Sequence, residues 1–191
     1  MNKTGIFGGT FDPVHKGHIL TAKKLVEIRK LDKLIFIPCN ISPHKTDKSA
    51  TAAVHRLEML KLAVQNHPEF DFTDYEIQKG DISYTLNTLE HFSKIYNKIE
   101  LVIGYDNLVS FHTWREPDKI LELADLIVMK RNTDSAIKPL NKYFGKANFV
   151  ETPVIDVSST EIRARLKNNS PISDLVPPEV EKYIIENKLY L

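Results

Sequence analysis

The chain has little of what marks an exported, membrane-embedded or disulfide-held protein. Cys39 is its only cysteine, so no intrachain disulfide can form. Its apolar runs, such as residues 126–129, are far shorter than the roughly 20 residues that a membrane-spanning helix needs. No apolar segment precedes the glycines near the start, so we expect no signal peptide. These absences predict a soluble, cytoplasmic protein without a membrane partner.

An excess of either charge is also missing. Lys and Arg together number 26 and Asp and Glu 25, which gives a net charge of +1. Binding to nucleic acid by bulk charge is therefore not expected, although a local basic site is compatible with this balance. Only seven glycines and ten prolines leave little room for linkers. The length predicts a single domain over residues 1–191, with residues 158–191 forming a helical segment that packs on it.

Short apolar segments alternate with segments of helical spacing along the chain. Strands are expected at residues 3–8, 33–38, 70–77, 99–104, 126–129 and 154–157. Helices are expected after residue 16 and at residues 52–66, 85–96, 107–111, 117–124, 158–167 and 178–187. This alternation predicts an α/β fold with a parallel sheet and helices on both faces. Ligands of such sheets bind beyond the carboxyl ends of the strands.

The loop after the first expected strand, residues 8–18, reads GGTFDPVHKGH. It fits neither the P-loop pattern nor the G-x-G-x-x-G dinucleotide fingerprint. Its two leading glycines nevertheless let a backbone approach a ligand closely. The helix beginning near Gly17 offers free N–H groups and a favourable dipole to an anion. His15 and His18 add two ring donors, although such a pair alone is typical of surface or capping positions, and a zinc site would need further ligands.

A second polar segment, residues 158–163, reads SSTEIR and opens another expected helix. Ser158 and Glu161 have the spacing of a capping box, which by itself indicates an ordinary capped helix. A helix start is also an anion site, and Arg163 lies one turn inside it. An arginine can hold two phosphate oxygens at once.

These two strings, in this order and at opposite ends of the chain, resemble the signatures of the nucleotidyltransferase superfamily with a T/H-x-G-H motif. Its members transfer AMP or CMP from a nucleoside triphosphate to a phosphate and release pyrophosphate. The resemblance implies a Rossmann-like nucleotidyltransferase fold in which His15, His18 and Arg163 contact the triphosphate. It also implies a backbone cradle and phosphate contacts formed by Gly8, Gly9, Thr10, Phe11, Ser159 and Thr160.

Three central segments bear on the acceptor of the transferred group. Residues 42–45 read SPHK, residues 80–89 read GDISYTLNTL, and residues 103–121 contain the only tryptophan, Trp114. A lone tryptophan usually belongs to a core, but this one stands in a polar stretch where its ring can stack on a flat ligand. The charge of the next residue, Arg115, would favour a carboxylate.

Together these segments resemble the nicotinate-nucleotide adenylyltransferases of that superfamily. The resemblance implies that Lys45 contacts phosphate and that Trp114 stacks on the pyridine ring. It implies further ligand contacts for Tyr84 and Thr85 beside the nicotinate carboxylate, Gly104 and Asp106 at the adenylate ribose, and Arg131 at the mononucleotide phosphate. The sequence departs from the family pattern at Ser42, at Tyr105 and after Arg131, where a Pro-Gly pair is missing.

The expected activity is therefore transfer of AMP from ATP to nicotinate mononucleotide, with pyrophosphate as the second product. His15, His18, Lys45 and Arg163 form the expected catalytic set. Mg²⁺ is expected as a cofactor held mainly by the ATP phosphates, without a metal site of the protein. Cys39 is interpreted as structural. The alternatives are adenylyl transfer to nicotinamide mononucleotide or to phosphopantetheine, and a non-catalytic nucleotide-binding module.

Overall fold

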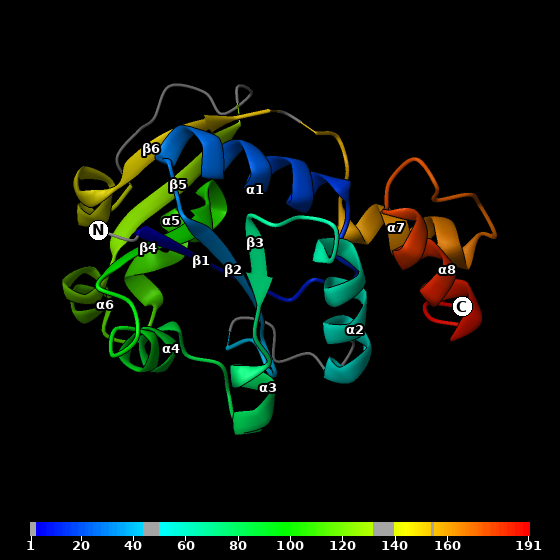
Figure 1. Ribbon diagram of the computed structural model, residues 1–191, viewed down its shortest axis with the longest axis horizontal. Coiled ribbons are helices and arrows are strands. Elements are labelled where there is room, and N and C mark those ends of the chain that lie inside the picture. The colour runs from blue at the N-terminus through cyan, green and yellow to red at the C-terminus, as the bar shows by residue number, and fades with distance from the viewer. Residues whose placement is uncertain (1–2, 44–49, 132–139, 154) are drawn as a thin grey trace.

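The computed structural model describes residues 3–43, 50–131, 140–153 and 155–191, and the side chain of Arg131 lies outside this description. Within these ranges the strands form one parallel sheet of order β3-β2-β1-β4-β5-β6 (Figure 1). Their bounds are β1 (Lys3–Gly9), β2 (Lys33–Pro38), β3 (Phe70–Phe72), β4 (Lys98–Gly104), β5 (Asp125–Arg131) and β6 (Asn148–Thr152). The predicted parallel α/β fold is confirmed, and its strand order reverses between β1 and β4, where such sheets bind ligands.

Helices cover both faces of this sheet. They are α1 (Lys16–Arg29), α2 (Ala53–Val64), α3 (Tyr75–Lys79), α4 (Thr85–Phe92), α5 (Tyr105–Ser110), α6 (Pro117–Leu123), α7 (Ser159–Lys167) and α8 (Pro178–Glu186), with 3₁₀ turns at η1 (Phe111–Thr113) and η2 (Lys142–Lys146). Side chains of α1, α2, α7 and α8 pack on one face and those of α4, α5 and α6 on the other. No helix in the described part of the chain is long and apolar enough to cross a membrane.

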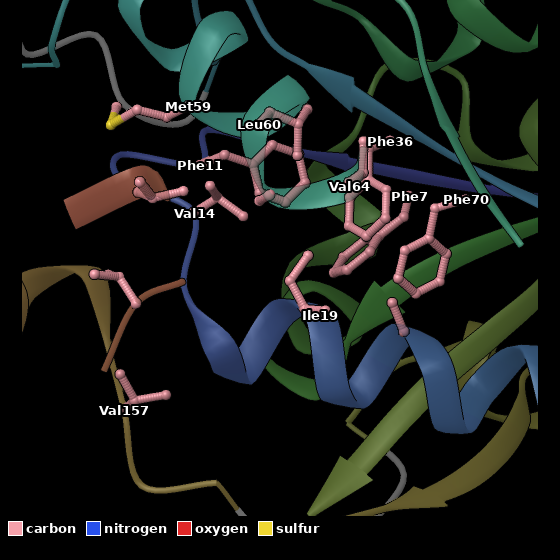
Figure 2. Close-up of a cluster of buried hydrophobic side chains, with 14 of the residues drawn as sticks. Phe7, Phe11, Val14, Ile19, Phe36, Met59, Leu60, Val64, Phe70 and Val157 are labelled. Atoms are coloured by element: carbon pink, nitrogen blue, oxygen red, sulfur yellow. The ribbon is translucent and has the colours of Figure 1, made fainter. Parts of the chain in front are cut away.

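Each central strand buries side chains on both faces because alternate residues point in opposite directions. Phe7 and Phe36 face the core under α1, whereas Ile6 and Ile35 face the core under α4. Figure 2 shows Phe7, Phe36 and Phe70 gathered in the first of these cores, where neighbouring rings lie 5.3–5.5 Å apart. Both faces of the strands are therefore apolar, as expected for a parallel sheet covered on two sides.

Two expected strands are corrected by the structure. Residues 70–77 form a strand only at Phe70–Phe72, and α3 follows. The Thr73 hydroxyl accepts a hydrogen bond from the N–H of Tyr75, which turns the backbone out of the sheet. The last strand is β6 rather than residues 154–157, because Pro153 lacks the N–H that a continuing strand would need. Residues 155–157 pair with no strand, and residue 154 lies outside the described residues.

A carboxylate without exposed surface joins α1 to the central strands at the end of the sheet opposite the carboxyl ends. Glu100 in β4 accepts hydrogen bonds from Arg29 Nε at 2.9 Å and Nη2 at 2.8 Å. Lys3 Nζ lies 3.2 Å from the same carboxylate. Burial acts to raise the pKa of Glu100, but the hydrogen bonds and charges of Arg29 and Lys3 outweigh it and hold the pKa below its usual value.

Replacing Glu100 with Gln should lower the free energy of unfolding at neutral pH by about 2–4 kcal/mol, because two cations lose their buried partner. The folded pKa lies below the unfolded one, so this stabilisation is full above about pH 4.5 and is lost as the pH falls through the folded pKa. Urea unfolding of both proteins at neutral and acidic pH measures the effect. An equal difference at both pH values would contradict this account.

Candidate active site

Two hollows meet at the carboxyl edge of the sheet, above the end of β1. The first, here called the α1 cavity, has a volume of about 400 Å³ and lies at the start of α1. The second, called the α4 cavity, has a volume of about 290 Å³ and lies at the start of α4. Gly8, Gly9 and Asn107 line both, so they form the ridge between the two cavities. Small-molecule sites commonly have volumes of this order.

The α1 cavity gathers most of the residues that the first signature predicted. Lining residues from the predicted set are Gly8, Gly9, Phe11, His15, His18, Gly104, Asp106 and Ser159. The starts of two helices, α1 and α7, contribute to its wall, and no acidic residue stands in the first turn of α1. Two helix N-termini beside one hollow favour a strongly anionic ligand.

The two histidines form one stacked unit at the start of α1. Their ring centroids lie 3.7 Å apart, and the backbone N–H of His15 donates to Nδ1 of His18 at 3.3 Å. An N–H group can only donate, so Nδ1 of His18 must be unprotonated and the ring proton sits on Nε2. Burial, assisted by the neighbouring His15, holds the pKa of His18 well below its usual value. His18 is therefore a neutral hydrogen-bond donor.

Two glycines in this loop are required by close packing. A Cβ at Gly9 would come within 2.8 Å of the Phe11 ring, which lies in the core under α1. A Cβ at Gly17 would come within 2.8 Å of Val157 and 2.9 Å of His15 Nδ1. The loop therefore owes its shape to side chains that leave no room for a methyl group at these positions.

The start of α7 is bonded directly to the loop after β1. Ser158 caps the helix by accepting the N–H of Glu161 at 3.1 Å. Ser159 Oγ donates to the carbonyl of Pro13 at 2.9 Å. Arg163 Nη1 donates to the carbonyl of Asp12 at 2.6 Å. The two signature segments, far apart in sequence, thus form one structural unit.

Thr160 and Arg163 stand beside the α1 cavity rather than in its lining. Arg163 Nη2 donates to Thr160 Oγ1 at 3.4 Å, so the two side chains lie together in the first turns of α7. Thr10 is placed differently from its predicted neighbours, because it lines the α4 cavity. The ridge at Gly8 and Gly9 explains this, since the chain crosses from one cavity to the other there.

The α4 cavity brings together the predicted acceptor residues Tyr84, Thr85 and Trp114. Trp114 is partly buried, and its ring lies 5.1 Å from that of Phe111. The Arg115 guanidinium lies 4.8 Å from the centroid of the Tyr84 ring, in cation–π contact. An aromatic platform and a cation therefore share one cavity.

Two other ionisable groups line the α4 cavity. Glu76 is buried and accepts a hydrogen bond from Thr88 Oγ1 at 2.5 Å. Burial raises the pKa of Glu76, which favours its uncharged form and lessens its repulsion of an anion. Burial also raises the pKa of the Cys39 thiol, so this cysteine is not an activated nucleophile.

Arg56 was not predicted as part of the site, yet it holds the segments next to the ridge. Its side chain is 1% exposed and donates to the carbonyls of Thr10 at 2.8 Å, Thr51 at 2.9 Å and Asn40 at 3.1 Å. The sequence did offer one signal for its burial. Arg56 stands four residues before Leu60, on the buried stripe of α2. A charged residue on an apolar stripe indicates a buried polar contact.

Two predicted site residues lie wholly or partly outside the described residues. Lys45 lies outside the described residues, and so does the side chain of Arg131, whose backbone ends β5. The described residues contain no group of three or more His, Cys, Asp or Glu able to hold a metal ion. Both oxygens of the Asp12 carboxylate are engaged, by Thr51 and Tyr190.

Known proteins resemble the chain over nearly its whole length. Residues 6–165 match the family model described as cytidylyltransferase-like. The nicotinate-nucleotide adenylyltransferase of Bacillus subtilis is 38% identical over 192 residues, covering 100% of this chain and 99% of that protein. The probable nicotinate-nucleotide adenylyltransferase of Clostridium acetobutylicum is 40% identical over 200 residues, covering 100% of both.

One solved structure shows the same fold at low sequence identity. Plasmodium falciparum nicotinic acid mononucleotide adenylyltransferase complexed with NaAD superposes with a TM-score of 0.83 at 22% identity. The match covers 100% of this chain and 98% of that one.

The geometry of His18 predicts its behaviour in solution. Between about pH 7.5 and pH 6 the ring should stay neutral, with its proton on Nε2, because its pKa is lowered and Nδ1 accepts a backbone N–H. Long-range ¹H–¹⁵N spectra of the histidine rings measure this directly. In urea the same residue should titrate near about 6.5. A doubly protonated His18 ring in the folded protein at pH 6 would contradict the assignment.

Proposed function

The chain belongs to the cytidylyltransferase-like family and, within it, to the nicotinate-nucleotide adenylyltransferases, and on this basis we propose that it transfers AMP from ATP to nicotinate mononucleotide. The products are nicotinate adenine dinucleotide and pyrophosphate, which makes this a step of NAD biosynthesis. The observation that carries the proposal is the pair of cavities meeting at one ridge. One is suited to a polyphosphate and the other to a flat acidic ring.

The α1 cavity is proposed to hold ATP. His15 and His18 donate to the triphosphate, supported by the N-termini of α1 and α7. Arg163, with Thr160 beside it, is proposed to contact the β- and γ-phosphates from the start of α7, whose Ser158 and Ser159 line or cap this cavity wall. The remaining proposed ATP contacts are Gly8, Gly9, Thr10, Phe11, Gly104, Asp106 and Ser159.

The α4 cavity is proposed to hold nicotinate mononucleotide. Trp114 stacks on the pyridine ring, and the N–H groups at the start of α4, by Tyr84 and Thr85, face the ring carboxylate. The acceptor phosphate then lies toward the ridge, next to the α-phosphorus of ATP. Lys45 and Arg131 remain predicted phosphate ligands.

The proposed chemistry is a single in-line displacement. An oxygen of the acceptor phosphate donates an electron pair to the α-phosphorus of ATP. The bond from that phosphorus to the bridging oxygen of the β-phosphate breaks, and this oxygen leaves with the pyrophosphate. The acceptor phosphate is already an anion, so no strong general base is needed. Catalysis rests on positioning the two substrates and on stabilising the developing charge.

Magnesium is proposed to arrive with the triphosphate. The described residues offer no cluster of metal ligands, and an ion held by phosphates and water fits that donor set. When bound, Mg²⁺ would supply positive charge against the triphosphate. His15, His18 and Arg163 would complement it from the protein side.

Preference for the acid over the amide is the finer part of the proposal. The cation–π contact holds Arg115 over Tyr84, at the cavity where the ring substituent would lie. A neutral amide would gain little from a cation, whereas a carboxylate would gain an ion pair. The nicotinamide and phosphopantetheine acceptors and the non-catalytic module are the competing functions.

The proposal also covers the domain organisation and the location of the protein. The whole chain acts as one domain, supported by core contacts that α7 and α8 share with α1 and α2. A cytoplasmic location is proposed as well.

Pyrophosphate release in the presence of ATP and Mg²⁺ tests the function. Nicotinate mononucleotide should support release far better than nicotinamide mononucleotide or phosphopantetheine. The His18→Ala variant should retain its fold but lose about 10- to 1000-fold in turnover, as expected for a lost charge-stabilising donor. His67→Ala, in the turn between α2 and β3 and outside both cavity linings, serves as the matched control. Release with none of the acceptors, alongside thermal stabilisation by ATP, would favour a non-catalytic module.

Arg115→Ala should reduce selectivity rather than general activity. We expect kcat/KM for nicotinate mononucleotide to fall about two- to fivefold, as for loss of an exposed ion pair, with kcat/KM for the amide nearly unchanged. Arg115→Lys should recover part of the loss. Steady-state kinetics with both acceptors measure the ratio. A parallel fall for acid and amide would show that Arg115 does not read the carboxylate.

A further inference from the structure

The segment after α8 returns to the active-site loop and ends a chain of contacts there. Tyr190 packs against the core under α1, and its hydroxyl donates to Asp12 Oδ1 at 2.6 Å. Asp12 is only 6% exposed, and it lies in the middle of the loop that leads to the two histidines. The side chain of a residue 178 positions away thus reaches the centre of the first signature.

Asp12 links three separate parts of the molecule. Its Oδ2 accepts the N–H of Thr51, just before α2, at 3.2 Å. Its own carbonyl accepts Nη1 of Arg163 in α7 at 2.6 Å. The carboxylate therefore faces Tyr190 and Thr51, while the backbone of the same residue faces the arginine proposed to bind ATP.

We propose that Tyr190 is a positioning residue for the triphosphate site, acting through Asp12 on Arg163. This inference rests on the proposed function, because it takes Arg163 as an ATP ligand. The phenol fixes the Asp12 carboxylate, the carboxylate fixes the orientation of the Asp12 peptide, and that carbonyl holds the guanidinium. Without the hydrogen bond from Tyr190, the Asp12 carbonyl that accepts from Arg163 is displaced.

The contact between Tyr190 and Asp12 is a directional hydrogen bond in addition to packing. Burial and the bond to Asp12 raise the pKa of Tyr190, so its hydroxyl remains a donor throughout the physiological range. An ionised carboxylate can only accept, and a buried one that loses a donor must move to find another. Tyr190→Phe would keep the ring and its packing and remove the hydroxyl, with its bond to Asp12 and its contact with the Thr51 side chain.

Tyr183 offers a matched control in the preceding helix. Its hydroxyl also forms a side-chain hydrogen bond, with His55 Nδ1 at 2.9 Å. That pair joins α2 to α8 and does not line either cavity. Tyr183→Phe therefore removes an equivalent phenol bond without reaching Asp12.

The test compares ATP binding by calorimetry in wild type, Tyr190→Phe and Tyr183→Phe. We expect Tyr190→Phe to weaken ATP binding about five- to tenfold and to raise the KM for ATP similarly, with the mononucleotide KM changing less than about twofold. Tyr183→Phe should leave ATP binding within about twofold of wild type. The calorimetric stoichiometry reports the folded fraction, so partial unfolding of the variant does not obscure its Kd.

A double-mutant cycle separates positioning from a general structural effect. In an Arg163→Ala background the Tyr190→Phe change should weaken ATP binding by less than about twofold, because its route to the ligand has been removed. Unchanged ATP binding in Tyr190→Phe, or a full additional loss in the Arg163→Ala background, would overturn the proposal. The binding comparison does not depend on turnover. An absence of pyrophosphate release in wild type would therefore reject the proposed function separately.

Discussion

The guanidinium of Arg56 is the constraint on which the arrangement of the two cavities depends. None of the ion pairs formed by the described residues involves Arg56, and three backbone carbonyls hold its charge instead. Burying a charge is costly unless it is hydrogen-bonded, so these carbonyls must stay where they are. They belong to the loops after β1 and β2 and to Thr51, in the segment that leads into α2. One side chain thereby sets the relative positions of the segments around the ridge.

The ridge separates two cavities with different lining residues. Gly8 and Gly9 have no side chains, and their backbone lines both cavities. Ligands on the two sides of the ridge can therefore approach each other closely. The neutral His18 ring lies beside His15 on one side, and Trp114 and Arg115 place an aromatic ring and a cation on the other. The guanidinium groups of Arg115 and Arg163 thus bring positive charge to this sheet edge in a chain whose net charge is only +1.

The parts of the fold and site that are local in sequence were predictable. Strand–loop–helix order placed β1, α1 and α7, and the two signatures predicted which loops would meet. The strand expected at residues 154–157 was wrong, because a short apolar run does not show that Pro153 has already ended the sheet. The buried stripe of α2 indicates that Arg56 needs a polar partner but not which one, since two of its three partners lie 16 and 46 residues away. Tyr190 was missed because its partner, Asp12, is 178 residues away and no local pattern encodes that contact.

Gly17 restricts which side chains the two signature segments can carry. The space that its missing side chain leaves is filled from one direction by His15 and from the other by Val157, which belongs to the segment leading into α7. A methyl group there would push on both at once. The identity of residue 157 is therefore tied to that of residue 17. A side chain at position 17 would require a smaller one at position 157, so these two positions are coupled although they stand near opposite ends of the chain.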